Sequence, residues 1–181
     1  MLRVTVTVVA AIAAIVGAVA VLGGRLPVSH VASRSAVIGA PIDTVFNTMT
    51  DLAAAPMWRS GVTRMTVTVD SSTGRRRVTE ESSSGTMTME VEELVAPSRL
   101  VMRIVGDGLP YGGAWAHALE AQGNETRVTI TEHGEVYNPI FRFISRYIIG
   151  HTGTMDTYLT DLGRKFGTDV TLAGAATVPL R

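Results

Sequence analysis

Four polar side chains that could carry out chemistry stand on faces of the chain that are otherwise apolar: Tyr111, His117, Glu132 and His151. An imidazole whose pKa lies near neutrality, placed beside a carboxylate, can shuttle protons in a cyclisation or a dehydration. A single histidine or glutamate on an apolar face is more often a structural residue with a hydrogen-bond partner. Distances between these residues do not follow from the sequence, so no catalytic role is assigned to any of them.

Composition and spacing exclude several other kinds of site. The chain has no cysteine, which excludes disulfides, thiolate catalysis and zinc sites built from cysteine. Its four histidines show no paired ligand spacing, so neither a metal nor another cofactor is expected. The formal net charge is zero, and polyanionic nucleic acid is therefore not an expected partner.

The elements that must position the four polar residues are mostly strands. Alternation of apolar and polar residues between turn signals predicts a series of strands and two short helices. The strands are expected at 31–38, 62–69, 75–82, 87–94, 100–105, 113–121 and 126–134, and the short helices at 42–49 and 51–55. The strand over 75–82 is polar on both faces, which favours a position at the rim of the sheet.

A single long helix is predicted over 139–166, because apolar residues recur there at spacings of three and four. Its apolar stripe includes Ile140, Ile148 and Met155, while arginines, a lysine and aspartates occupy the opposite side. We expect this helix to lie across the apolar face of the sheet and to enclose a cavity.

The residues expected to face this cavity come from five strands and from the long helix. They are Met65, Val67, Met87, Met89, Met102, Trp115, His117, Ile130, Ile148, His151 and Met155. Several are methionines, whose flexible thioether side chains adapt to irregular apolar ligands but also fill gaps in ordinary cores. Both interpretations stay open for the methionines, and the converging faces are where a ligand is expected.

The first 24 residues form a separate segment. Residues 4–22 are all apolar except Thr5 and Thr7, and as a helix they reach roughly 28 Å, close to the ~30 Å hydrocarbon core of a bilayer. A cleaved signal peptide, with its cleavage signal at 18–20, is the alternative. We favour an uncleaved single-pass anchor, because the apolar run continues past that point. Flanking positive charges do not separate the two orientations, whereas the short N-terminal tail favours an extracytoplasmic globular domain.

The globular part resembles the SRPBCC or START-like superfamily, which includes the birch-pollen-allergen-like proteins and the polyketide cyclases/dehydrases. The resemblance rests on the sequence at 35–38, 40–46, 50–51, 56–58, 112–115, 126–132 and 158–166. It implies an α+β helix-grip fold: a curved seven-stranded antiparallel sheet, two short helices after the first strand, and a long C-terminal helix over a cavity. The expected organisation is an anchor at 1–24, a linker at 25–30, the START-like domain at 31–167 and a flexible tail at 168–181.

The resemblance also implies a ligand, because members of this superfamily bind or transform apolar molecules. We therefore expect membrane-tethered binding of a lipid or other hydrophobic small molecule, without catalysis. The alternative is a polyketide cyclase, aromatase or dehydratase that uses the four polar candidates as acids or bases. The identity of the ligand and the oligomeric state do not follow from the sequence.

Overall fold

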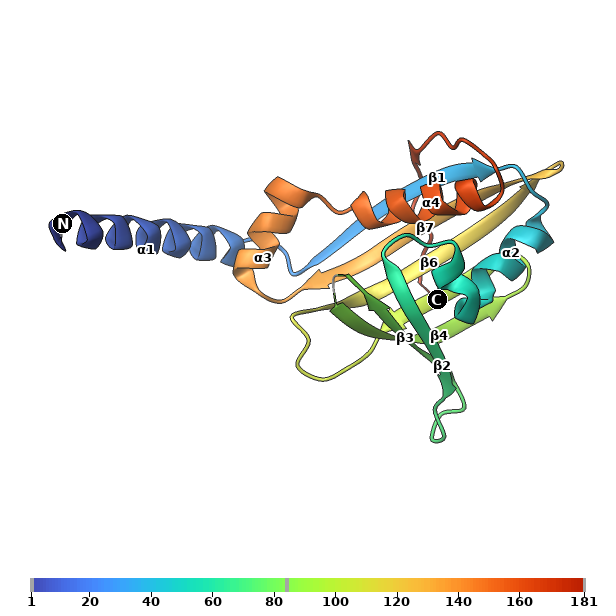
Figure 1. Ribbon diagram of the computed structural model, residues 1–181, viewed down its shortest axis with the longest axis horizontal. Coiled ribbons are helices and arrows are strands. Elements are labelled where there is room, and N and C mark those ends of the chain that lie inside the picture. Colours follow the sequence, from blue (N-terminus) through green and yellow to red (C-terminus); the bar gives the residue numbers. More distant parts are fainter. Residues whose placement is uncertain (1, 84, 181) are drawn as a thin grey trace.

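The structure is a computed structural model that describes residues 2–83 and 85–180, with side chains described from residue 5 onward. One antiparallel sheet forms the body, helices lie against one of its faces, and α1 (Leu2–Gly24) projects from one end (Figure 1). The other helices are α2 (Ile42–Thr50), the 3-10 helix η1 (Leu52–Met57), α3 (Pro139–Ile144), the π-helical segment η2 (Ser145–Ile149) and α4 (Gly153–Lys165). The strands are β1 (Ser29–Ile38), β2 (Val62–Val69), β3 (Arg76–Ser82), β4 (Gly85–Val95), β5 (Arg99–Ile104), β6 (Tyr111–Gln122), β7 (Glu125–Val136) and β8 (Ala173–Gly174).

The sheet has the strand order β2-β3-β4-β5-β6-β7-β1-β8, and its neighbouring strands are antiparallel. β1 pairs with β7 from Ser29 opposite Glu135 to Ile38 opposite Thr126, so the first strand lies beside the last long one. This architecture confirms the predicted α+β helix-grip fold. The strand count is eight rather than seven, because the short β8 adds to the edge of β1.

The single long helix predicted over 139–166 is wrong. The chain forms α3 and η2, leaves the helical conformation at Gly150, where φ is 80°, and begins α4 at Gly153. A positive φ costs glycine little and other residues much more, so Gly150 permits this break. Of the residues predicted as one helix, those of α4 cover the inner face of the sheet, whereas Ile148, on the other side of the break, is 71% exposed.

The expected flexible tail, 168–181, is instead packed against the sheet over its described part. Val178 is buried on the outer face, against Ala116 of β6. Its backbone N–H donates to the Thr131 hydroxyl at 2.9 Å, and its carbonyl oxygen lies 2.8 Å from His133 Nε2. The small outward side chains of β6, which the sequence shows as alternate alanines, leave room for this segment.

Two apolar cores occupy the inner side of the sheet. The first contains the fully buried Met155, Leu159 and Leu162 of α4, packed with residues of α2, β1, β6 and β7. The second lies beneath η1, on strands β2 to β5. Asp161 of α4 links the two regions, because its Oδ2 accepts hydrogen bonds from the backbone N–H and the hydroxyl of Ser60, each at 2.6 Å.

The N-terminal helix α1 stands apart from both cores. The segment Thr5–Gly24 is long and apolar enough to cross a membrane, and it is almost entirely exposed. Its C-terminal end touches the body: Gly23 lies so close to Pro139 of α3 that a Cβ there would collide with the Pro139 carbonyl. An exposed apolar helix of this kind is unfavourable in water and favourable in a bilayer.

Candidate functional site

A cavity of about 280 Å³ lies between the two cores. This volume is close to the lower end of the ~300–1,000 Å³ range of small-molecule sites. Of the residues expected to face it, six line its wall: Met65, Met87, Met89, Met102, Trp115 and His117. Protein interiors are otherwise packed as densely as organic crystals, so a hollow of this size marks the site where a ligand would fit.

The other five residues expected at the cavity lie elsewhere in the structure. Ile130 and Met155 are fully buried in the core beneath α4. Val67 is 39% exposed, because it lies in the second half of the edge strand β2, where the strand is no longer covered. Ile148 is exposed because the helix breaks at Gly150, and His151, within that break, packs on another histidine.

The cavity wall opposite the sheet was not predicted from the sequence. It is formed by Met49 of α2, Leu52 and Ala55 of η1, and Trp58, which follows η1. The segment is rich in alanine and contains a proline, so it shows no strong periodicity. The signal that could have located it is the short apolar run before Trp58, at the point where the chain returns to the sheet.

His117 lines the cavity and carries a buried hydrogen-bond acceptor. Its side chain lines the cavity although the residue is only 2% exposed, and its Nδ1 lies 3.2 Å from the Leu100 carbonyl oxygen. A carbonyl only accepts, so Nδ1 carries the proton and Nε2 is the acceptor. Nε2 is buried and has no hydrogen-bond partner among the described residues. Burial lowers the pKa of His117 to about 4, because the imidazolium form would lose its hydration.

An ion pair is built into the cavity wall beside these apolar residues. The Arg59 guanidinium donates to both carboxylate oxygens of Glu80, at 2.7 and 3.3 Å, and both side chains are largely buried. Glu80 belongs to β3, which lies between β2 and β4, so the predicted rim position of this strand is wrong. β3 looks polar on both faces because its inward face carries this paired glutamate. The bidentate pairing satisfies a carboxylate that would otherwise be costly to bury.

Aromatic rings fix the shape of the cavity around Tyr158 of α4. Its ring centroid lies 5.3 Å from that of Trp58, 6.1 Å from that of Trp115 and 5.7 Å from that of His117. The two tryptophans meet it edge to face, a favourable arrangement of aromatic quadrupoles. The Arg59 guanidinium also lies 5.2 Å from the Tyr158 ring. Burial raises the pKa of Tyr158 to about 12, so its hydroxyl keeps its proton at neutral pH.

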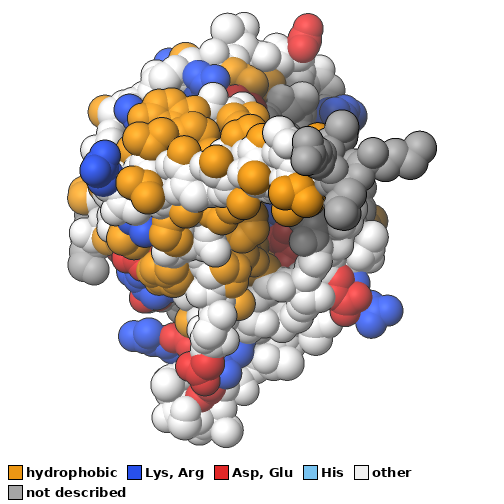
Figure 2. Space-filling view, turned by 90° about the vertical axis from the view of Figure 1, so that its left-hand side faces the viewer, with side chains coloured by type: hydrophobic (Ala, Val, Ile, Leu, Met, Phe, Trp, Pro, Cys, Tyr) orange, Lys and Arg blue, Asp and Glu red, His pale blue; other side chains and the backbone are white. Residues whose placement is uncertain are grey.

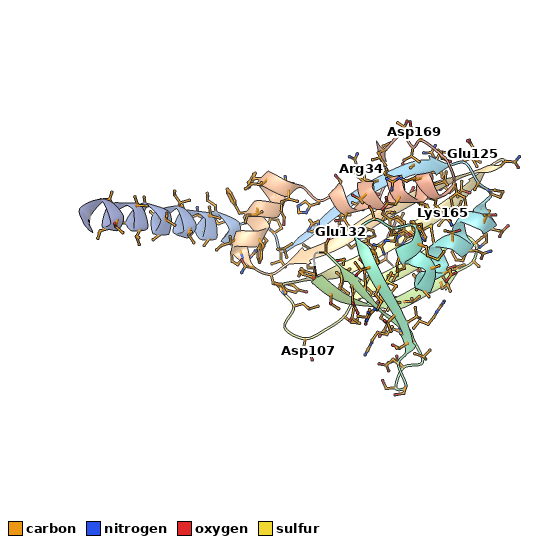
Figure 3. The ribbon with its side chains drawn as sticks, in the orientation of Figure 1. Arg34, Asp107, Glu125, Glu132, Lys165 and Asp169 are labelled. Carbon is orange, nitrogen blue, oxygen red and sulfur yellow. The ribbon has the colours of Figure 1, made fainter. Side chains whose placement is uncertain are left out.

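A further set of polar side chains surrounds Glu132, which lines the cavity near the start of α4 (Figure 3). The Glu132 carboxylate lies 3.2 Å from His30 Nε2, and the His30 ring stacks on His151 with 3.8 Å between centroids. Gly134 allows this arrangement, because a Cβ at that position would collide with the His30 ring. Burial, and then the neighbouring His30, lower the pKa of His151. His30 was not predicted, since its proximity follows only from the strand register that places it opposite Gly134.

Three of the four polar candidates therefore line the cavity: Tyr111, His117 and Glu132. Tyr111 is 39% exposed at the start of β6, where it lies at the edge of the cavity. His117 and Glu132 are on adjacent strands but offset by two residues, and their hydrogen bonds go to Leu100 and His30. The arrangement thus gives the His117 imidazole and the Glu132 carboxylate different hydrogen-bond partners.

A helix-grip fold with an apolar cavity between sheet and helices defines the class of START-like proteins. Over residues 29–166 the chain matches the family described as polyketide cyclase/dehydrase and lipid transport, and it belongs to that family. No curated protein sequence matches the chain.

Solved structures show the same fold at low sequence identity. A START superfamily protein from Mycobacterium smegmatis has a TM-score of 0.60 and 13% identity, over 76% of this chain and 97% of its own. A conserved protein from Geobacillus kaustophilus reaches 0.63 with 12% identity, over 79% and 99%. The Zhui aromatase/cyclase from a Streptomyces species reaches 0.60 with 8% identity, over 77% and 94%. At these identities the likeness extends to the fold alone.

Proposed function

We propose that this protein binds an apolar small molecule in its internal cavity, that α1 tethers it to a membrane, and that it does not transform the ligand. The ligand of this proposal has a mainly apolar body and one hydrogen-bond donor, a hydroxyl or an N–H group. The observation that carries the proposal is a buried, unpartnered acceptor, Nε2 of His117, on a residue that lines a cavity whose other walls are largely methionine, leucine and aromatic side chains.

The physical reason for a donor on the ligand is the cost of an unmet acceptor. A buried polar group without a partner destabilises a protein by about 1–3 kcal/mol, and a ligand donor removes that penalty. The methionines supply adaptable apolar contact for the remainder of the molecule. Because the aromatic rings around Tyr158 pack on one another, much of this wall exists before the ligand arrives.

Binding without chemistry is supported by the protonation states at the site. With a pKa of about 4, the His117 ring is a weak base, and at pH 7 it is almost never protonated and so cannot serve as a general acid. Arg59 and Glu80 are paired with each other, so neither is an isolated acid or base. A general acid or base works best when its pKa lies near the working pH.

Tethering is supported by the exposure of α1. The segment Thr5–Gly24 is long and apolar enough to cross a membrane and is almost entirely exposed, and the helix packs on the body at its C-terminal end. A poorly soluble ligand partitions into lipid, so a binding domain held at the bilayer surface meets it at a high local concentration.

The test is to identify what co-purifies with the full chain. Native mass spectrometry of the detergent-solubilised protein, followed by organic extraction, should reveal an apolar compound with a hydroxyl or N–H group. Met89→Trp, which fills the cavity, should abolish its retention, whereas Val69→Trp, on the exposed part of β2, should retain it. Equal retention by both variants, or an empty wild-type protein in native membranes, would contradict the proposal.

One observation favours a second candidate, an acid–base enzyme of the cyclase, aromatase or dehydratase kind. Glu132 lines the cavity and contacts His30, which forms the imidazole–carboxylate pair that such chemistry needs. Turnover of a model polyketide chain by the wild type, lost in Glu132→Gln and His30→Asn while binding persists, would establish this candidate instead.

A further inference from the structure

Large apolar side chains are exposed beside the point where α1 joins the body. They belong to α3 and η2: Phe141, Tyr147, Ile148 and Ile149 are each more than half exposed. We refer to these four residues as the α3–η2 patch. Hydrophobic side chains gather on this end of the molecule, from which α1 projects (Figure 2). A clustered patch of this kind is unusual on a soluble monomer and marks a surface that contacts something apolar.

The α3–η2 patch is continuous with the proposed membrane anchor. The end of α1 packs on α3 through Gly23 and Pro139. The link is reinforced by Arg142, whose guanidinium donates to the Leu26 carbonyl oxygen at 2.8 Å, just after α1. Figure 1 shows α3 crossing the end of α1 rather than continuing its direction. With α1 along the bilayer normal, a helix in this crossing orientation lies along the bilayer surface.

The composition of the segment fits the region between lipid tails and water. Tyr147 favours this depth, because its ring can enter the tails while its hydroxyl stays hydrated, and Phe141 adds an apolar ring. Arg146 is exposed on the same short segment, where its guanidinium group can reach phosphate headgroups. We propose that α3 and η2 lie in the interfacial region of the bilayer that α1 spans, with the α3–η2 patch in contact with the acyl chains.

This inference rests on the proposed tether and adds a route for the ligand. The chain passes from the patch through Gly150 to His151, which stacks on His30, which in turn contacts Glu132 in the cavity wall. One end of the cavity therefore lies close to the bilayer surface, and an apolar molecule could move between lipid and cavity without crossing bulk water. The break in the helix, which separates α3 and η2 from α4, lets the patch face lipid while α4 covers the sheet.

The absence of cysteine makes a direct test possible with single spin labels on the full chain. Three variants are reconstituted separately in phosphatidylcholine–phosphatidylglycerol nanodiscs: Ile12→Cys in α1, Ile148→Cys in the patch and Val69→Cys on β2 as the control. All three positions are exposed in the structure, so labels there need not disturb packing. Accessibility to oxygen, which concentrates in lipid, is compared with accessibility to a water-soluble nickel chelate by electron paramagnetic resonance.

We expect the label at Ile12 to be deepest, that at Ile148 to lie at the depth of the upper acyl chains, and that at Val69 to be in water. If Ile148 is as open to the nickel chelate as Val69 while Ile12 is protected, the interfacial placement is wrong and the tether stands. If Ile12 is itself open to water, or is missing from the mature chain by mass spectrometry, the tether is wrong. Dipolar broadening at Ile148 that disappears on dilution with unlabelled chain would show that a second copy covers the patch, which also overturns the proposal.

Discussion

Replacing His117 by leucine should remove the ability of the cavity to distinguish a ligand with a hydroxyl from one without it. The side chain lines the cavity, and its Nε2 is the acceptor that has no partner among the described residues. A suitable pair of probes is 2-naphthol and naphthalene, which share their ring system and differ by one hydroxyl. His117→Leu keeps the wall apolar while deleting the acceptor.

The size of the effect follows from the burial of His117. Only 2% of the residue is exposed, so bulk water has little access to the acceptor in the empty cavity. Relieving an unmet buried acceptor gains about 1–3 kcal/mol, which corresponds to a preference for 2-naphthol of about 5- to 150-fold in the wild type. In His117→Leu the hydroxyl itself is buried without a partner, so the preference should vanish or reverse.

The assay is isothermal titration calorimetry of the full chain at pH 7, with the heat of probe partition into empty micelles subtracted. Met102→Leu is the matched control, because it changes another wall residue on the adjacent strand β5 without altering a hydrogen bond. It should change the affinity of both probes by a similar factor. A wild type that binds the two probes equally, or a His117→Leu variant that keeps the preference, would refute the role assigned to Nε2.

Three further predictions concern stability, each measured by urea unfolding followed through tryptophan fluorescence. Folding lowers the pKa of His117 from 6.5 to about 4, so the unfolded chain binds the proton more readily than the folded chain. Acidification across this interval should therefore lower the free energy of unfolding of the wild type by about 3 kcal/mol more than that of His117→Leu. Equal losses in the two proteins would contradict the pKa shift. Arg59→Met should lower the free energy of unfolding by ~3–5 kcal/mol, because Glu80 keeps a buried charge without its cation. Replacing both residues by methionine should recover most of this loss. A double variant whose loss equals the sum of the losses of the two single variants would show that the pair is not coupled. Gly134→Ala should cost ~1–3 kcal/mol, because its Cβ would meet a histidine ring, whereas Gly153→Ala, with open space around it, should be nearly neutral; equal values for the two would disprove the close approach.

Much of the fold could be predicted because its signals are local. Trp115 and His117 alternate with alanines along β6, and in the structure these two residues line the cavity while Ala114 and Ala116 are buried on the outer face. The helix break was missed because the apolar spacing continues through it, although Gly150 and Gly153 stand within the same stretch. Periodicity records which residues are apolar, and it does not record a change in backbone direction at a single glycine.

The hydrogen-bond partners of the polar residues in the site could not be predicted, because these contacts join distant parts of the chain. Glu80 belongs to a strand whose sequence is polar on both faces and therefore suggests exposure to solvent. In the structure its carboxylate is buried because Arg59, from a distant part of the chain, donates a hydrogen bond to it. His30 contacts Glu132 only because β1 returns along β7 in a register that sets His30 opposite Gly134. Sequence spacing alone specifies neither contact, whereas most of the sheet side of the cavity follows from strand alternation.

The same long-range polar contacts explain how the fold keeps its interior hollow. An apolar cavity tends to close, because side chains gain dispersion contacts when the walls approach one another. Here η1 is held at a fixed distance from the sheet at its C-terminal side: Arg59 bonds Glu80 on β3, and the adjacent Ser60 bonds the buried Asp161 of α4. Buried charged pairs of this kind require defined geometry, so they resist the shift that collapse would need. The residues that maintain the cavity are therefore polar, while those expected to contact the ligand are mostly apolar, and substitutions of the two groups should separate loss of shape from loss of affinity.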